Sequence, residues 1–154
     1  MLGFKRFPNE IECLRELSAK FNLIFDVSDD NSALMIGTNF AVNVSVDREG
    51  VRYWYIDLSR APDITEYALD FFVVRQRRFI PAKPGDSEAD NITRVRNELR
   101  EACEALKTCA SDILSGDRAW INEYTFGTSK PVGDYRKKLL RTVESRRRQA
   151  RVPA

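Results

Sequence analysis

The sequence predicts an α+β fold with an N-terminal helix, a four-stranded, mainly antiparallel sheet, and a C-terminal helical half packed on one face of the sheet. Apolar residues recur at helical spacing over residues 11–21 and then alternate with a period of two as far as residue 58. Helical spacing returns from about residue 89 to residue 113. Strands grouped in one stretch and helices grouped in another are typical of α+β domains.

Length and composition predict one domain followed by a short appendage. The chain has 154 residues, of which 43% are hydrophobic and 31% charged. A segment rich in Gly, Ser and Pro over 125–133 marks a boundary, so we expect an α+β domain over 1–133 and a basic tail or appended helix over 134–154. Because no apolar run suits a signal peptide or a membrane span, we expect a cytoplasmic protein without membrane contact.

The most informative absence is that of histidine. Histidine is the usual general base at neutral pH and the commonest metal ligand, so catalysis by Ser-His-Asp or Cys-His and most catalytic zinc sites are excluded. The three cysteines, Cys13, Cys103 and Cys109, have no Cys-x-x-Cys spacing, and no glycine-rich phosphate loop occurs. We therefore predict no catalytic residue, no metal site and no cofactor, and a protein that is not an enzyme.

The first helix should begin at Asn9, because Asn9 and Glu12 have the spacing of a capping box. It should end near Lys20. Four strands follow, over 21–27, 33–36, 40–47 and 51–58. The hairpin of the last two has two candidate registers. A two-residue loop at Glu49-Gly50 mixes polar and apolar residues on both faces. A type I turn with Gly50 in a bulge gives one almost wholly apolar face, so we expect this register.

The expected register pairs Val44 with Trp54 and Val42 with Ile56, which places Trp54 in the core. It leaves a candidate partner-binding surface on the opposite face of the sheet: Asn43, Ser45, Tyr53, Tyr55 and Asp57. Tyrosine among small polar residues is typical of protein interfaces. Two alternatives remain: the C-terminal helices cover this face, or its tyrosines are ordinary solvent-facing strand residues.

The helical half contains a candidate capping box at Asp63 and Glu66, and a long helix that should begin near residues 89–92. Leu114-Ser115-Gly116 should stop that helix. The helix that follows the Asp63–Glu66 capping box has three cations in its last turn, where positive charge complements the helix dipole: Arg75, Arg77 and Arg78.

The positive charge is concentrated at the end of the chain. Residues 134–154 carry eight Lys/Arg against two Asp/Glu, whereas residues 1–133 carry 17 against 21. The alternative function is therefore a nucleic-acid-associated module. It would use the cluster of Arg75, Arg77 and Arg78 and the cations of the tail, which are Arg136, Lys137, Lys138, Arg146, Arg147 and Arg148. Because the tail has few apolar residues, we expect its removal to leave the fold intact.

The order of helix, four short strands and a helical half containing Asp112-Ile113-Leu114-Ser115-Gly116-Asp117 resembles small single-domain immunity proteins of bacterial polymorphic and contact-dependent toxin systems. The resemblance covers roughly residues 10–126. It implies a cytoplasmic protein that neutralises a toxin domain by stoichiometric binding, and it implies no catalytic residues. The sequence leaves the partner's identity and the oligomeric state unknown.

Overall fold

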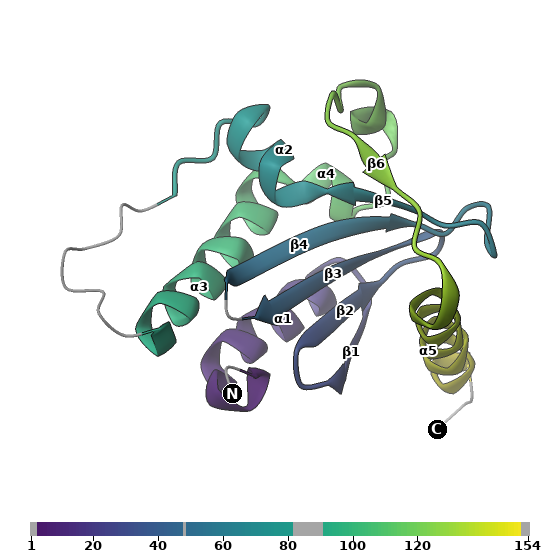
Figure 1. Ribbon diagram of the computed structural model, residues 1–154, viewed down its shortest axis with the longest axis horizontal. Coiled ribbons are helices and arrows are strands. Elements are labelled where there is room, and N and C mark those ends of the chain that lie inside the picture. The colour runs from purple at the N-terminus through teal and green to yellow at the C-terminus, as the bar shows by residue number, and fades with distance from the viewer. Residues whose placement is uncertain (1–2, 48, 82–90, 152–154) are drawn as a thin grey trace.

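The computed structural model describes residues 3–47, 49–81 and 91–151, and within them it shows an antiparallel sheet with helices on both faces (Figure 1). The six strands lie in chain order and are β1 (Ile24–Asp29), β2 (Ser32–Ile36), β3 (Phe40–Asp47), β4 (Gly50–Asp57), β5 (Thr65–Ala68) and β6 (Thr128–Ser129). The helices are η1 (Phe4–Arg6), α1 (Pro8–Lys20), α2 (Leu69–Arg75), α3 (Asn91–Cys109), α4 (Ser111–Leu114), η2 (Ala119–Asn122) and α5 (Gly133–Arg151).

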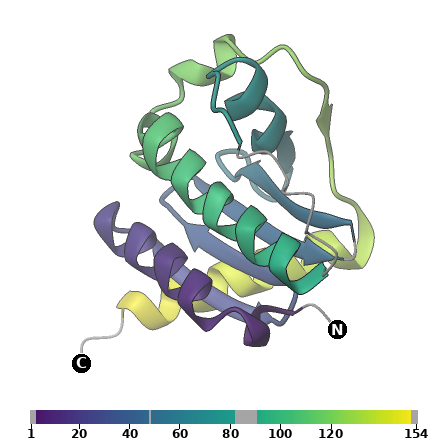
Figure 2. The same cartoon turned by 90° about the vertical axis from the view of Figure 1, so that its left-hand side faces the viewer.

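The first face of the sheet carries the main core. Helices α1 and α3 lie side by side on this face, with α5 behind the sheet (Figure 2). The valines of β3 and the tyrosines of β4 point into this core, where they meet Leu14 and Leu17 of α1 and an apolar stripe of α3. That stripe is Val95, Leu99, Ala102, Ala105 and Leu106. Its spacing of three and four residues is the one from which the sequence predicts this helix.

The second face is covered in part by α5, whereas the sequence predicts a C-terminal helical half on one face and a tail or appended helix over 134–154. Leu139 and Val143 of α5 are 5% and 3% exposed. They pack on a smaller apolar cluster formed by Leu34, Ile36, Ala41, Ile56, Leu58 and Ile64. A sheet with apolar residues on both faces must be covered on both.

The α+β class, the N-terminal helix and the antiparallel strands agree with the prediction, but the sheet has two more strands than expected. Residues 65–68 form β5, whose Glu66 pairs with Ile56, where the sequence predicts the start of a helix capped by Asp63. Backbone pairing with β4 outweighs the local capping pattern, and α2 begins only at Leu69. Ser129 of β6 then pairs with Glu66 along the free edge of β5.

The register of the β3–β4 hairpin differs from the predicted one by one residue. Asp47 pairs with Gly50, so Val44 lies opposite Tyr53 and Asn43 opposite Trp54. The predicted turn includes Arg48, which lies outside the described residues. The Asp47 carboxylate accepts hydrogen bonds from the backbone N–H groups of Glu49 (2.8 Å) and Gly50 (3.2 Å). Gly50 has a φ of +130°, a conformation that favours glycine.

The helix ends follow the sequence in part. α1 begins one residue earlier than the predicted cap, with Pro8 in its first turn, a position that proline suits. α3 ends at Cys109 and a separate short helix, α4, leads to Gly116, whose φ of +94° fits the predicted helix stop. No helix within the described ranges is both long and apolar enough to cross a membrane.

Candidate functional site

The predicted partner-binding face does not exist as one surface. Asn43 and Ser45 lie on the α5 side of the sheet, whereas Tyr53, Tyr55 and Asp57 lie on the side of α1 and α3. Tyr53 is 6% exposed and Tyr55 only 1%. The one-residue difference in register moved every β4 side chain to the opposite face. The tyrosines therefore belong to the core, and the prediction that these five residues share one exposed face is wrong.

Tyr55 sits in an aromatic cluster that fixes η2 to the sheet. Its ring stacks on Phe40 at 5.4 Å between ring centres and meets the edge of Trp120 at 4.8 Å. Burial raises the pKa of Tyr55 to about 12, even though the nearby Arg118 lowers it. Tyr55 is 1% exposed and contacts two aromatic rings, so its role is packing.

Asp57, the last residue of the predicted face, is a structural anchor. Its two carboxylate oxygens accept hydrogen bonds from the Arg118 guanidinium at 3.1 and 3.0 Å, and a third bond comes from the Ser59 hydroxyl at 2.6 Å. Burial alone would raise the pKa of Asp57, but the bonds from Arg118 and Ser59 more than offset it, and the pKa falls below its usual value. The pair ties the end of β4 to the segment before η2.

This pair predicts part of the acid sensitivity of the protein. Because the pKa of Asp57 is lowered by folding, its stabilising effect is present above the unfolded value, about 3.9, and is lost as the pH falls through the folded one. We expect Asp57→Asn to lower the melting temperature at pH 7 and to make the decline below about pH 4 shallower. Melting curves between pH 7 and pH 2.5 measure both, with Glu16→Gln on α1 as control. If the melting temperature of Asp57→Asn falls with acid as steeply as that of the wild type, the stabilising role of the Asp57–Arg118 pair is contradicted.

The tail cations of the nucleic-acid alternative are mostly engaged within the chain. Lys138 pairs with Asp29 at 3.2 Å, and Arg146 with the buried Asp26 at 3.3 Å. Arg147 donates to two backbone carbonyls and Arg148 pairs with Glu144. Arg136 and Lys137 lie at the start of α5, where Arg136 is half-buried and Lys137 exposed. The contacts of Lys138 and Arg146 dock α5 on β1, and those of Arg147 dock it on the turn between β2 and β3.

Arg75, Arg77 and Arg78 do not form one patch either. Arg77 makes a two-bond ion pair with Asp112, each bond 2.9 Å long, and donates to the Cys109 carbonyl at 3.1 Å. It therefore holds the end of α2 against α3 and α4. Arg75 and Arg78 are exposed, and Arg75 lies over the ring of Phe71.

A different aromatic and cationic surface lies on the α5 side of the sheet, beside α2. The guanidinium carbon of Arg52 is 4.8 Å from the Trp54 ring centre and 4.9 Å from that of Phe71. Asp70 pairs with Arg52 and fixes its position. We call Arg52, Trp54, Phe71 and Arg75 the Arg52–Trp54–Phe71 surface. Phe71 is 46% exposed and Trp54 is half-buried, so the prediction that Trp54 belongs to the core is wrong.

Sequence reasoning missed this surface although a signal for it exists. Phe71, Val74 and Arg75 are three and four residues apart and so share one face of α2. The buried stripe of the same helix is Leu69, Phe72 and Val73. In the sequence, Phe71 and Val74 widen that stripe, but in the structure they are exposed. The missing information was the register that brings Arg52 beside them.

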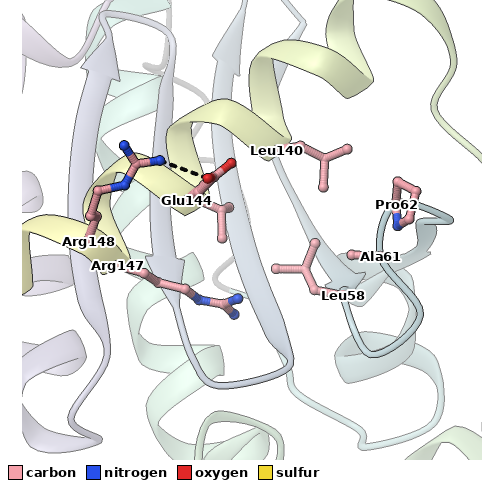
Figure 3. Close-up of a pocket in the computed structure, with 8 residues that line it drawn as sticks. Leu58, Ala61, Pro62, Leu140, Glu144, Arg147 and Arg148 are labelled. Carbon is pink, nitrogen blue, oxygen red and sulfur yellow. Dashed lines mark hydrogen bonds and ion pairs between the residues drawn. The ribbon is translucent and has the colours of Figure 1, made fainter. Parts of the chain in front are cut away.

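A hollow lies where α5 meets the loop after β4 (Figure 3). It has a volume of about 500 Å³, and we call it the α5 pocket. Its lining residues are Leu58, Ala61, Pro62, Leu140, Val143, Glu144, Arg147 and Arg148. In Figure 3, Leu58, Ala61, Pro62 and Leu140 lie on one side, and the charged residues of α5 lie on the other.

The residues described contain no group of three or more Cys, Asp or Glu side chains that could hold a metal ion. Comparison with protein-family models, with curated proteins and with solved structures finds no match to this chain. The candidate surfaces must therefore be judged by their own chemistry.

Proposed function

We propose that this protein is a non-catalytic binding protein of the immunity type, which neutralises a bacterial toxin domain by stoichiometric binding through the Arg52–Trp54–Phe71 surface. The observation that carries the proposal is the stack of Trp54, Arg52 and Phe71. Tryptophan and arginine are the side chains most enriched among residues that dominate binding energies. Here both occur together with a partly exposed phenylalanine.

The stack is also held in place before any partner arrives. Arg52 is held by two aromatic rings and by Asp70, and Trp54 is anchored in the middle of a paired strand. Side chains that are already ordered lose little conformational entropy on binding, so more of their contact energy appears as affinity. Arg75 at the rim adds positive charge, which suits a partner surface that presents carboxylates beside apolar groups.

Two further observations favour binding of a protein over the alternatives. The chain has no histidine, so a catalytic role would rest entirely on carboxylates, lysine or tyrosine. Four of the tail cations, Lys138, Arg146, Arg147 and Arg148, already contact acceptors of this chain. Neutralising phosphates with them would require breaking those contacts, which weighs against the nucleic-acid reading.

The test begins with the full chain as bait in a native lysate, followed by titration calorimetry against the captured protein. We expect one-to-one binding, and we expect the partner's toxic activity to fall in proportion to the amount of this protein added. Phe71→Ala combined with Arg75→Ala should weaken binding at least thirtyfold, about 2 kcal/mol, if these residues are anchors. Both side chains are exposed, so the fold should survive.

Val132→Ala is the matched control, because Val132 is an exposed apolar residue, 76% accessible, just before α5. Equal affinity of wild type and the Phe71/Arg75 variant would contradict the proposed surface. A partner whose activity is unaffected by saturating amounts of this protein would contradict the neutralising function. Retention on DNA that falls steeply with salt would instead favour the nucleic-acid module.

A further inference from the structure

We propose that a second pocket, between α5 and strands β1 to β3, binds a small uncharged carboxamide that pairs with the side chain of Asn43. We call it the Asn43 pocket, and its argument rests on the lining residues Leu34, Asn43, Tyr135 and Leu139, with Asp29 and Lys138 beside them. None of these residues belongs to the Arg52–Trp54–Phe71 surface, and the inference does not depend on the partner being a toxin.

Asn43 is a buried polar residue whose hydrogen-bonding capacity is largely unused. It is 7% exposed, and its Oδ1 accepts no hydrogen bond from any residue that the structure describes. Its Nδ2 donates to the Tyr135 hydroxyl over 3.5 Å, which is long for a hydrogen bond. Buried acceptors in proteins are nearly always paired, because an unpaired one costs its full desolvation energy. A ligand that brings an N–H group to Asn43 Oδ1 recovers that energy.

Tyr135 supplies a donor beside this acceptor. Burial raises the pKa of its hydroxyl, and Glu66 raises it further, although the hydrogen bond from Asn43 lowers it. The hydroxyl therefore keeps its proton at neutral pH. Because the Tyr135 oxygen accepts from Asn43, its proton is left to donate to a ligand's carbonyl oxygen. A carboxamide has an N–H donor next to a C=O acceptor, so it matches Asn43 Oδ1 and the Tyr135 hydroxyl together.

The charges at the pocket are balanced, which favours an uncharged ligand. Asp29 pairs with Lys138 at 3.2 Å, and Asp26, which also lines the pocket, pairs with Arg146 at 3.3 Å. A ligand's ammonium group would have to displace one of these cations of α5. A ligand's carboxylate would lie near two aspartates and would bring no donor to Asn43 Oδ1.

The size and the apolar walls of the pocket limit the ligand to a short chain. Its volume is about 90 Å³, about three times the roughly 30 Å³ that one water molecule occupies in the liquid. Leu34 and Leu139, which are 7% and 5% exposed, provide apolar contact. Ser32 and Thr142 add hydroxyl acceptors for the second N–H of a primary carboxamide. The pocket therefore suits a primary carboxamide on a short aliphatic chain.

The experiment is a titration of the ¹⁵N- and methyl-labelled full chain with propionamide, followed by NMR. We expect shifts at the side-chain NH₂ group of Asn43 and at the methyl groups of Leu34 and Leu139. Propionate, propylammonium and 1-propanol are of similar size, and each should bind at least fivefold more weakly, because each fails to make at least one of the hydrogen bonds. Absence of shifts at tens of millimolar propionamide, or equal binding of any of the three comparison compounds, would overturn the proposal.

Variants test the two polar groups separately. Tyr135→Phe removes a hydroxyl from a ring that is 45% exposed, so the fold should survive and propionamide should bind about fivefold more weakly or worse. Asn43→Asp keeps the shape of the side chain but adds a negative charge that takes the Tyr135 proton, so the preference should move from propionamide to propylammonium. Ser45→Ala removes a hydroxyl from the same strand outside the pocket and should change nothing. Unchanged binding of propionamide by Tyr135→Phe that melts like wild type would contradict the site, whether or not Asn43→Asp folds.

A final comparison separates the two sources of a carboxamide, a free small molecule and a glutamine side chain of a polypeptide. The probes are N-acetyl-glutamine N-methylamide and N-acetyl-alanine N-methylamide, which share their backbone amides. Tighter binding of the glutamine compound assigns the pocket to a side chain. Equal binding of these two compounds, with propionamide binding at Asn43, assigns it to a free carboxamide. Since all probes are synthetic, none of these results bears on the toxin-binding proposal.

Discussion

Replacing Trp120 by alanine should destabilise the protein by about 3–5 kcal/mol, the range typical of a fully buried tryptophan. Trp120 is 1% exposed and its ring centre lies 4.8 Å from that of Tyr55, 5.3 Å from Phe72 and 5.4 Å from Tyr67. Its loss leaves a cavity where η2, β4 and α2 meet. Chemical denaturation followed by circular dichroism measures the change in unfolding free energy.

Trp54→Ala is the matched comparison, because the chemical change is the same and only the environment differs. Trp54 is half-buried on the α5 side of the sheet, so we expect a loss near 1 kcal/mol, as for an average substitution. The register predicted from sequence would instead place Trp54 in the core and give it the larger loss. Equal losses for the two tryptophans would contradict the β3–β4 register described above.

Deleting residues 134–154 should abolish the cooperative melt, in contrast to the expectation from sequence that this segment is dispensable. Removal of α5 exposes Leu34, Ile36, Ala41, Ile56, Leu58 and Ile64 on the second face of the sheet. Apolar surface on an uncovered sheet loses its burial energy and promotes aggregation. Differential scanning calorimetry of the truncated chain, together with size-exclusion chromatography, checks both consequences.

A point variant tests the same contact without removing the helix. Leu139→Ala should cost about 2–5 kcal/mol, since Leu139 is 5% exposed and packs on the second face. Lys137→Ala changes an exposed position two residues earlier in α5 and should have little effect. A truncated chain that melts like wild type, with a neutral Leu139→Ala, would mean that α5 does not dock.

The helices α1 and α3 and the antiparallel strands could be predicted because their signals are local. The stripe from Val95 to Leu106 and the alternation from Phe40 to Val46 each identify the side of an element that faces the main core. For β5, the capping pattern at Asp63 and Glu66 is also local, but the pairing of Glu66 with Ile56 is not. Sequence spacing cannot report a hydrogen-bond partner ten residues away.

The candidate surfaces were beyond the reach of the sequence for the same reason. Placing Arg52 beside Phe71 requires both the register of β4 and the position of α2. The α5 pocket requires a helix docked on the second face of the sheet, and the sequence left open whether C-terminal helices cover the face opposite the core. Leu139 and Val143 gave too weak an apolar stripe to reveal that docking.

The sequence by itself determined the α+β class, the helices on the first face of the sheet and the absence of histidine chemistry, because periodicity and composition are properties of single segments. Only the tertiary structure decided which face of β4 is buried. Tyrosine and tryptophan are both apolar enough for a core and polar enough for a surface, so the alternation of β4 is compatible with either face. The packing of Trp120 against Tyr55, and of α5 against the other face, selects one.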